Sequence, residues 1–203
     1  TLSHIDEKKE LEKYKEEVLS KVDKNMSEED IAYLEEDLRS PCTQEIAVFR
    51  AFAEIVERSK NEVVVIDTAP TGHTLLLLDS TQSYHREIQR SQGDIPESVK
   101  MLLPRLRNSN ETETIIVTLA ETTPVYEAMR LEEDLNRAGI NSKWWVINSS
   151  LLATNTSNII LKAKASNEIT WINKVNEISD GNFAVIEWKP EEVKGERLLD
   201  LIN

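Results

Sequence analysis

The segment from Val63 to Thr74 constrains the fold more than any other part of this chain. It begins with a short run of β-branched residues, Val63 to Ile66, followed directly by Asp67. Such a run is typical of a central strand that is buried on both faces. Pro70 and Gly72 then interrupt the strand, and an apolar stretch at residues 75–78 begins a new element. The segment therefore predicts a strand with an acidic tip, a short loop and a helix.

The rest of the chain extends this pattern into an α/β domain. Beyond residue 62, apolar strand-like runs alternate with helical patterns, which implies a mainly parallel sheet with right-handed crossovers. Three amphipathic helices precede the sheet. We expect one domain over residues 1–203, with a helical insert at about 7–60 and the sheet with its flanking helices at about 61–203. The expected helices are 7–24, 28–38, 42–59, 125–137, 155–178 and 195–202, and the further strands are 113–119, 143–148 and 182–188.

Polar residues follow each predicted strand. They are Asp67, Ala120–Glu121, Asn148–Ser149 and Glu187–Trp188. Carboxyl ends of parallel strands lie along one edge of a sheet, where α/β proteins bind ligands, most often nucleotides. At such an edge, Asp67 could hold Mg²⁺ directly or through water. A helix cap or turn residue is its alternative role.

Composition excludes some classes of function. The net charge is −13, from 37 acidic and 24 basic residues, which argues against nucleic acid as a partner. Cys42 is the single cysteine, so no disulfide can form within the chain, and this fits a reducing compartment. No apolar run approaches the roughly 20 residues that span a bilayer. The first residues, Thr1–His4, resemble the tail of a strand, so we expect a fragment of a longer protein.

A phosphate-binding loop is not found in the sequence. There is no G-x-x-x-x-G-K-[ST] motif, and the five glycines are widely separated. We therefore expect this chain alone to bind a nucleoside triphosphate poorly.

Three motifs carry a resemblance to a known family. They are D67-T-A-P-T-G-H-T-L-L-L-L-D79, E35-E-D-L-R-S-P-C-T-Q-E-I-A-V-F49 and E121-T-T-P124. Together they closely resemble the second, C-terminal nucleotide-binding half of the arsenical pump-driving ATPases, and the similarity extends over nearly the whole chain. It implies a three-layer, P-loop NTPase-like α/β fold that is incomplete at the N-terminus, with the P-loop upstream of Thr1.

The resemblance also implies a metalloid site. In the family, a cysteine, a histidine and a nearby serine serve a site for trivalent arsenic or antimony between the two halves, and here these are Cys42, His73 and Ser40. Thiolate is the preferred ligand of such soft ions, and imidazole can complete the shell. A buried apolar role for Cys42 and a surface position for His73 are the alternatives. As(III) or Sb(III) would act as an allosteric ligand.

The nucleotide site is implied in the same way. Asn148 corresponds to a strand-end asparagine that hydrogen-bonds adenine, and Pro190 and Val193 lie in the adenine-side loop. Glu187 stands where the family usually has proline. Asp6 corresponds to a carboxylate near the Mg²⁺ shell, beside Glu7 where the family has proline.

These correspondences predict a soluble ATPase half that uses ATP and Mg²⁺. Its partners would be an N-terminal ATPase half or a second subunit and an integral-membrane arsenite pump, which places it in the cytoplasm and, when bound to the pump, at the inner membrane. One alternative is an ATP-dependent targeting factor for tail-anchored membrane proteins. Related eukaryotic proteins of that kind typically carry a Cys-x-x-Cys pair, which this chain lacks. A non-catalytic interaction half is the other alternative.

Overall fold

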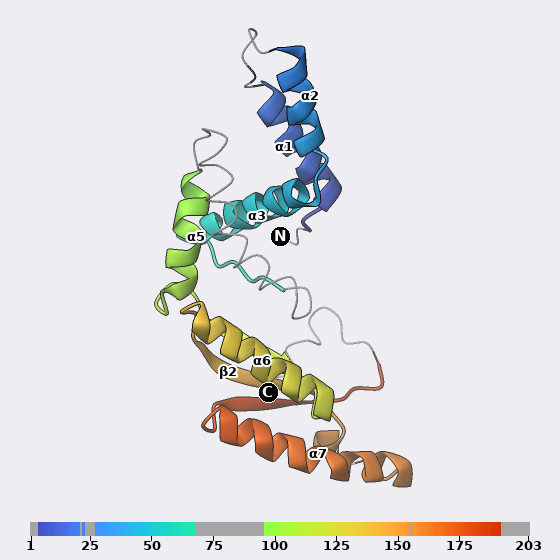
Figure 1. The fold of residues 1–203 in the computed structure, drawn as a ribbon. Coiled ribbons are helices and arrows are strands. Elements are labelled where there is room, and N and C mark those ends of the chain that lie inside the picture. Colours follow the sequence, from blue (N-terminus) through green and yellow to red (C-terminus); the bar gives the residue numbers. More distant parts are fainter. Residues whose placement is uncertain (1–3, 21, 23–26, 68–95, 155, 192–203) are drawn as a thin grey trace. The chain divides into compact units, whose positions relative to one another are not determined.

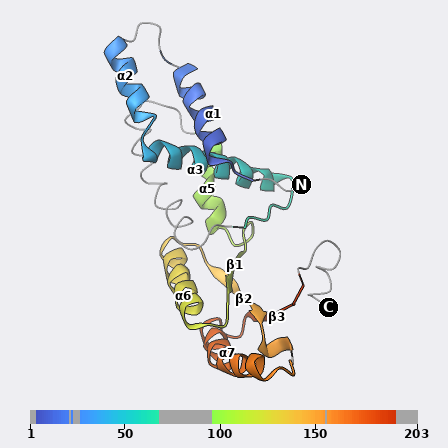
Figure 2. The same ribbon diagram turned by 90° about the vertical axis from the view of Figure 1, so that its right-hand side faces the viewer.

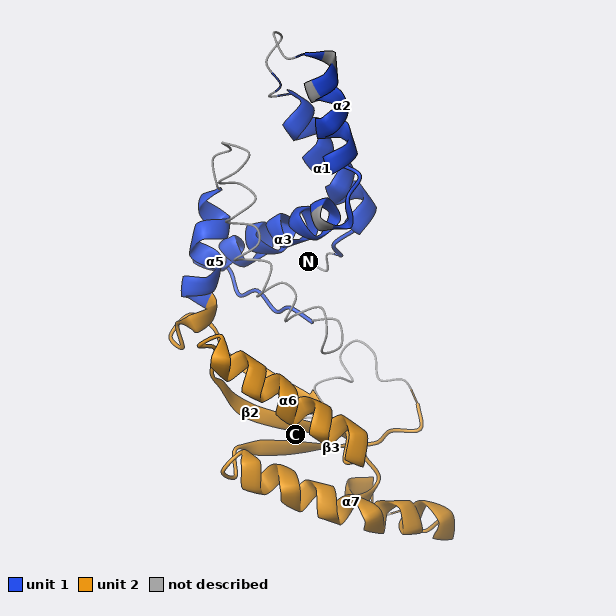
Figure 3. Ribbon diagram, in the orientation of Figure 1, with its two compact units in different colours: residues 1–105 blue, residues 106–203 orange. Residues whose placement is uncertain are grey.

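The computed structural model describes residues 4–20, 22, 27–67, 96–154 and 156–191, except the side chains of residues 28, 30 and 42. The chain forms two compact units, residues 1–105 (unit 1) and residues 106–203 (unit 2), which Figure 3 colours separately. The expected single domain stays a prediction. None of the helices in the described ranges is long and apolar enough to cross a membrane.

Unit 1 is helical in the residues described. Helix α3 packs against α1, and its buried face is apolar at helical spacing, with Phe49, Ala53 and Val56 buried. Helix α5 begins in unit 1 and ends just beyond its boundary, and the Arg105 guanidinium donates to Ser59 Oγ at 3.1 Å. The elements are α1 (Glu7–Ser20), α2 (Glu28–Asp37), α3 (Pro41–Glu57), the 3₁₀ turn η1 (Arg58–Lys60) and α5 (Glu97–Arg107).

The start of α3 is fixed by a side-chain cap and a proline. Ser40 is the N-cap, its Oγ accepts from the Thr43 backbone N–H at 3.2 Å, and Pro41 is the first helical residue. Proline fits that position because its missing N–H would have no partner there.

Unit 2, in the residues that the structure describes, is a three-stranded parallel sheet with helices packed on it. Its strands lie in the order β1-β2-β3, and helices α6 and α7 form the crossovers between them (Figures 1 and 2). This confirms the predicted α/β architecture with a parallel sheet flanked by helices. The elements are β1 (Thr114–Thr118), α6 (Thr122–Arg137), β2 (Ser142–Ser150), the 3₁₀ turn η2 (Leu152–Thr154), α7 (Ile159–Ile178) and β3 (Phe183–Glu187).

The core of unit 2 lies between one face of the sheet and these two helices. Trp145 is 1% exposed, and its indole N–H donates to Glu132 Oε1 at 3.2 Å, so its polar atom is satisfied. The ring of Tyr126 on α6 meets that of Trp171 on α7 edge to face, with centroids 5.7 Å apart. The core cluster comprises Ile116, Ala120, Val125, Ala128, Trp145, Ile147 and Val175.

Some elements differ from the prediction. Residues 63–67 have no regular secondary structure, and Val63 and Val65 are 93% and 89% exposed, so the strand expected at 63–66 is wrong for this structure. A strand requires hydrogen-bonded neighbours, which a β-branched run does not supply by itself.

The boundaries of two helices were also misjudged. Thr123 followed by Pro124 is typical of an N-cap and a first helical residue, but helix α6 begins at Thr122 with Glu121 as N-cap, so Thr123 is a helical residue and not the cap. Helix α7 begins four residues later than expected, after the N-cap Asn158, whose side chain accepts from the N–H groups of Ile160 and Leu161. The polar tract at 80–109 contains Gly93, Pro96 and Pro104, which favour a loop broken by short helical pieces, and its described part contains α5. The helix expected at 195–202 lies outside the described residues.

Candidate functional site at the carboxyl edge of the sheet

The carboxyl ends of β2 and β3 lie side by side in unit 2. The Trp188 N–H donates to the Ser150 carbonyl at 2.9 Å, which continues the pairing of the two strands past the end of β3. Asn148 on β2 and Pro190, two residues after Trp188, are both exposed. Asn148 therefore lies near the end of β2, and Pro190 follows the adjoining end of β3 by three residues. The third predicted adenine-side residue, Val193, lies outside the described residues.

The end of β2 contains an irregularity that includes Asn148. Ile147 pairs with Val185 and Ser150 pairs with Glu187, so β2 advances by three residues where β3 advances by two. Ser149, inside this bulge, has a φ of 55°, which is uncommon for a residue other than glycine. Bulges redirect side chains and occur near functional sites. The backbone at Asn148 is thus bent away from a regular strand.

A buried glutamate holds the segment after the bulge. Glu168 on α7 is 5% exposed, and its carboxylate accepts from Ser150 Oγ at 2.7 Å and from the backbone N–H groups of Leu151 and Leu152, each at 3.1 Å. Three donors satisfy a group that is otherwise costly to bury. One carboxylate therefore fixes the chain direction directly after β2.

Sequence reasoning missed Glu168. The signal was present, because Ala165, Glu168, Ile172 and Val175 recur at helical spacing, which puts one acidic residue within an otherwise apolar stripe. A glutamate in such a stripe indicates a buried carboxylate that needs donors.

The polar residue at the end of β1 is bound to the same helix. Lys164 on α7 forms an ion pair with the Glu121 carboxylate at 3.1 Å, with both side chains about half exposed. After β3, Lys189 pairs with Glu187. The predicted gathering of polar residues along one edge is thus found for β1, β2 and β3.

The two predicted catalytic carboxylates belong to unit 1. Asp6 is exposed and caps α1, because its Oδ1 accepts from the N–H groups of Lys8 and Lys9 at 3.1 and 3.2 Å. Asp67 is exposed, in the segment without regular structure. The described contacts of Asp6 are those of a helix cap.

Of the three residues predicted for the metalloid site, Ser40 has a described side chain. Its hydroxyl caps α3 and lies 3.1 Å from Thr43 Oγ1, which itself donates to the Asp37 carbonyl at 2.7 Å. Cys42 is in the first turn of the same helix, and its side chain is not described. His73 lies outside the described residues. Elsewhere, among the residues that are described, no three His, Cys, Asp or Glu side chains are grouped so as to hold a metal ion.

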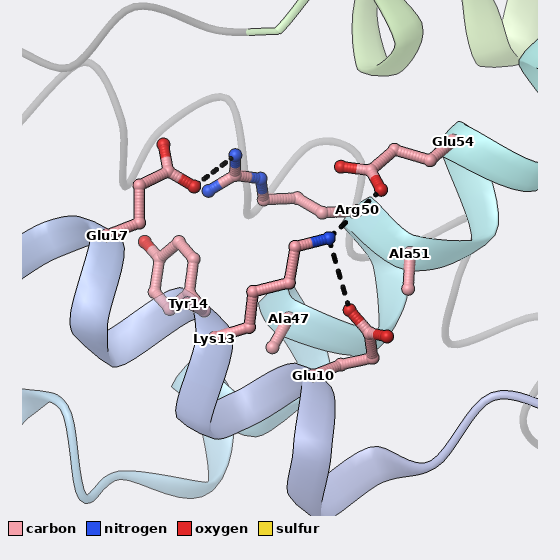
Figure 4. Close-up of a pocket in the computed structure, with 8 residues that line it drawn as sticks. All are labelled: Glu10, Lys13, Tyr14, Glu17, Ala47, Arg50, Ala51 and Glu54. Atoms are coloured by element: carbon pink, nitrogen blue, oxygen red, sulfur yellow. Dashed lines mark hydrogen bonds and ion pairs between the residues drawn. The ribbon is translucent and has the colours of Figure 1, made fainter.

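A surface pocket lies between α1 and α3, and none of the predicted site residues lines it (Figure 4). Arg50 binds the Glu17 carboxylate at 2.9 Å and lies over the Tyr14 ring, 5.2 Å from its centroid. Lys13 lies between Glu10 and Glu54, at 3.7 and 3.3 Å. The charged side chains that line the pocket therefore form ion pairs with one another. Such pairs are typical of a contact between two helices rather than of a ligand site.

A match to one protein family covers the whole chain. The model of the anion-transporting ATPase family matches residues 1–103 and 91–203. An arsenical pump-driving ATPase of Escherichia coli is 43% identical over 195 residues, which cover 96% of this chain and 33% of that protein. The arsenical pump-driving ATPase of Acidiphilium multivorum is 41% identical over 203 residues, covering 100% of this chain and 35% of that protein.

More distant relatives also match. ATPase GET3 of Paracoccidioides brasiliensis is 25% identical over 188 residues, which cover 74% of this chain and 55% of that protein. The chain spans about a third of the length of the first curated relatives it matches.

Proposed function

Since the chain belongs to the anion-transporting ATPase family, we propose that it is part of an ATPase that couples ATP hydrolysis to the delivery of arsenite or antimonite to a membrane efflux pump. The observation that carries this proposal is the high identity, across nearly the whole chain, to proteins named arsenical pump-driving ATPases. In this proposal the chain acts together with a further ATPase half or a second subunit, in the cytoplasm, and is peripheral to the inner membrane when it engages the pump.

The adenine would bind at the carboxyl edge of unit 2. The exposed Asn148 amide can donate and accept, as the edge of adenine requires. Asn148 lies near the end of β2, next to the strand end that Pro190 follows, and this position supports the assignment. Val193 would complete the contact with adenine.

Asp67 and Asp6 would serve the phosphate end of the nucleotide and its Mg²⁺. Asp67 fits a magnesium ligand because its side chain is exposed and carboxylate oxygen is what Mg²⁺ prefers. Asp6 fits less well, since its Oδ1 already caps α1. Mg²⁺, when bound with ATP, supplies positive charge that offsets the charge developing on the phosphates.

The metalloid would bind through Cys42 and His73, with Ser40 nearby. A single thiolate is a weak site for As(III) or Sb(III), so further ligands would come from the partner half. The segment Asp67–His73 would connect this site to the nucleotide, because its ends carry one residue of each.

A metalloid titration of ATPase activity tests the proposal. The complete natural protein that contains this chain is assayed with ATP and rising arsenite or antimonite. We expect stimulation in the wild type, and a strong loss of stimulation in Cys42→Ala and His73→Ala. His4→Ala, which removes an exposed histidine elsewhere in unit 1, is the matched control and should retain it. Equal stimulation in all four proteins would contradict the metalloid site, and no ATP hydrolysis in the wild type would contradict the ATPase.

The second candidate is an ATP-dependent targeting factor for tail-anchored membrane proteins. The relatives named ATPase GET3 are compatible with it, but they are less similar and match less of the chain. Capture of a hydrophobic tail helix by the complete protein, with no response to metalloid, would favour this alternative. A protein that binds ATP without hydrolysing it would instead favour the non-catalytic interaction half.

A further inference from the structure

We infer that Glu168 is a positioning residue for adenine recognition, because it holds the end of β2 that carries Asn148. This inference rests on the proposed function, and it assigns a role to a buried side chain on α7 that does not itself touch the base.

The carboxylate of Glu168 is buried. Glu168 is 5% exposed, and Ser150, whose hydroxyl donates to it, is 1% exposed. A buried carboxylate contributes little to a core by itself, since an apolar residue of similar size would pack there without desolvating a charge. The presence of a carboxylate at this position is explained by the groups that it binds. These are the backbone N–H groups of Leu151 and Leu152, in addition to the Ser150 hydroxyl.

These hydrogen bonds restrain an irregular stretch of backbone. They act directly after the bulge, in which Ser149 has a φ of 55° and the pairing with β3 changes register. A backbone of this kind persists only when the surrounding structure holds it. From β3, the Trp188 N–H binds the Ser150 carbonyl at 2.9 Å, so Ser150 is fixed by its main chain on one side and by its hydroxyl on the other.

The restrained backbone includes Asn148. An asparagine amide can read a base only if its direction is fixed, because rotation by half a turn exchanges its donor and its acceptor. Asn148 is exposed, and it stands two residues before Ser150 in the bulge. Restraint of Ser150 by Glu168 therefore restrains the backbone from which the amide projects. Without it, ATP would bind more weakly and would be distinguished less well from other triphosphates.

The test compares ATP and GTP as substrates of the complete natural protein. Glu168→Gln keeps the size of the side chain but replaces one acceptor oxygen with a donor that faces N–H groups. We expect a rise of about tenfold in the KM for ATP, the equivalent of roughly one hydrogen bond. We further expect kcat within about twofold of wild type and a reduced preference for ATP over GTP. Asn148→Ala should give the same pattern, and Glu177→Gln, an exposed glutamate on the same helix, should give neither change.

Ser150→Ala keeps the test decisive if Glu168→Gln does not fold, because it removes one of the three donors and leaves the carboxylate in place. It should shift KM and the nucleotide preference in the same direction by a smaller factor. Hydrogen exchange gives a direct readout, since the amides of Leu151 and Leu152 should exchange faster in both variants.

The variants distinguish a failure of the role inferred for Glu168 from a failure of the proposed adenine site. If Asn148→Ala loses the ATP preference while folded Glu168→Gln or Ser150→Ala keeps it, the inference is wrong and the proposed adenine site stands. If the Glu168 variant loses activity only in proportion to its folded fraction, its role is structural and the inference is again overturned. If Asn148→Ala leaves the KM for ATP unchanged, the proposed adenine site is wrong and the inference falls with it.

Discussion

Units 1 and 2 use their polar side chains differently. In unit 2, Glu132 and Glu168 accept hydrogen bonds at or beneath the sheet, from the Trp145 indole and from the chain after β2. In unit 1, Asp6 and Ser40 cap helices, and Arg50 and Glu17 pair between helices. The contacts of Glu168 are buried, whereas those of Ser40 and Arg50 are half-buried and those of Asp6 are exposed. Buried polar contacts specify backbone positions, and exposed ones contribute small increments of stability. Substitutions in unit 2 should therefore have larger effects than comparable ones in unit 1.

The largest expected effect is in the core of unit 2. Trp145→Ala removes a side chain that is 1% exposed and deprives Glu132 of a donor, so we expect a loss of about 3–5 kcal/mol in the free energy of unfolding. Hydrogen exchange of the amides in β1 and β2 measures this for unit 2 separately. Trp144→Ala, at the next position of β2 and 43% exposed, is the matched control, with an expected loss below about 1.5 kcal/mol. Equal losses would contradict the assignment of one sheet face to the core.

The contact between α1 and α3 should give a smaller effect. Arg50→Ala removes the ion pair with Glu17 and the packing over Tyr14, and the Arg50 side chain is 17% exposed, so we expect a loss of about 1–2 kcal/mol. The loss is measured by hydrogen exchange in α1 and α3. Lys13→Ala on the same contact, where the lysine is 60% exposed, should cost less than about 0.5 kcal/mol. If Lys13→Ala lowers the free energy of unfolding more than Arg50→Ala does, the expected order of the two ion pairs is wrong.

Substitution of Ser40, a predicted metalloid-site residue, tests whether its side chain stabilises the fold. Ser40→Ala removes the N-cap of α3 and should destabilise unit 1 by about 1 kcal/mol, while Ser40→Asp should retain most of the stability. Urea unfolding followed by circular dichroism measures both variants. Ser20→Ala removes a hydroxyl that donates to the Glu17 carbonyl near the end of α1, and it should have little effect. If Ser40→Ala is as stable as wild type, the cap does not contribute to stability. That result would favour a role for Ser40 at the metalloid site.

The smallest effect concerns Glu57 at the end of α3. The hydrogen bond from Lys60 lowers the pKa of its carboxyl from the ordinary value of 4.5. Since the folded pKa lies below the unfolded one, the contribution to stability is present above the unfolded pKa and is lost as pH falls through the folded pKa. A carbon NMR titration should show the Glu57 pKa rising toward 4.5 in Lys60→Met. An unchanged pKa would mean that the pair does not form in solution.

Much of the architecture of unit 2 could be predicted from its sequence. Apolar runs at the expected places became β1, β2 and β3, and the alternation with helices fixed a parallel sheet, because crossovers of this length join parallel strands. The capping of α3 by Ser40 was also predictable, since N-caps depend on neighbouring residues alone. The family and the motif residues were likewise evident from the chain itself.

Only the tertiary structure decided which polar groups meet. The run Val63–Ile66 has the composition of a strand but has no regular structure here, because pairing depends on neighbours distant in sequence. Asn148 was identified from the family resemblance and from its place at a strand end. The bulge around it depends on the pairing of β2 with β3, and the contacts of Glu168 depend on α7 packing against β2, so neither could be predicted from the sequence. Local patterns determine which elements form, and contacts between elements determine where each functional group points.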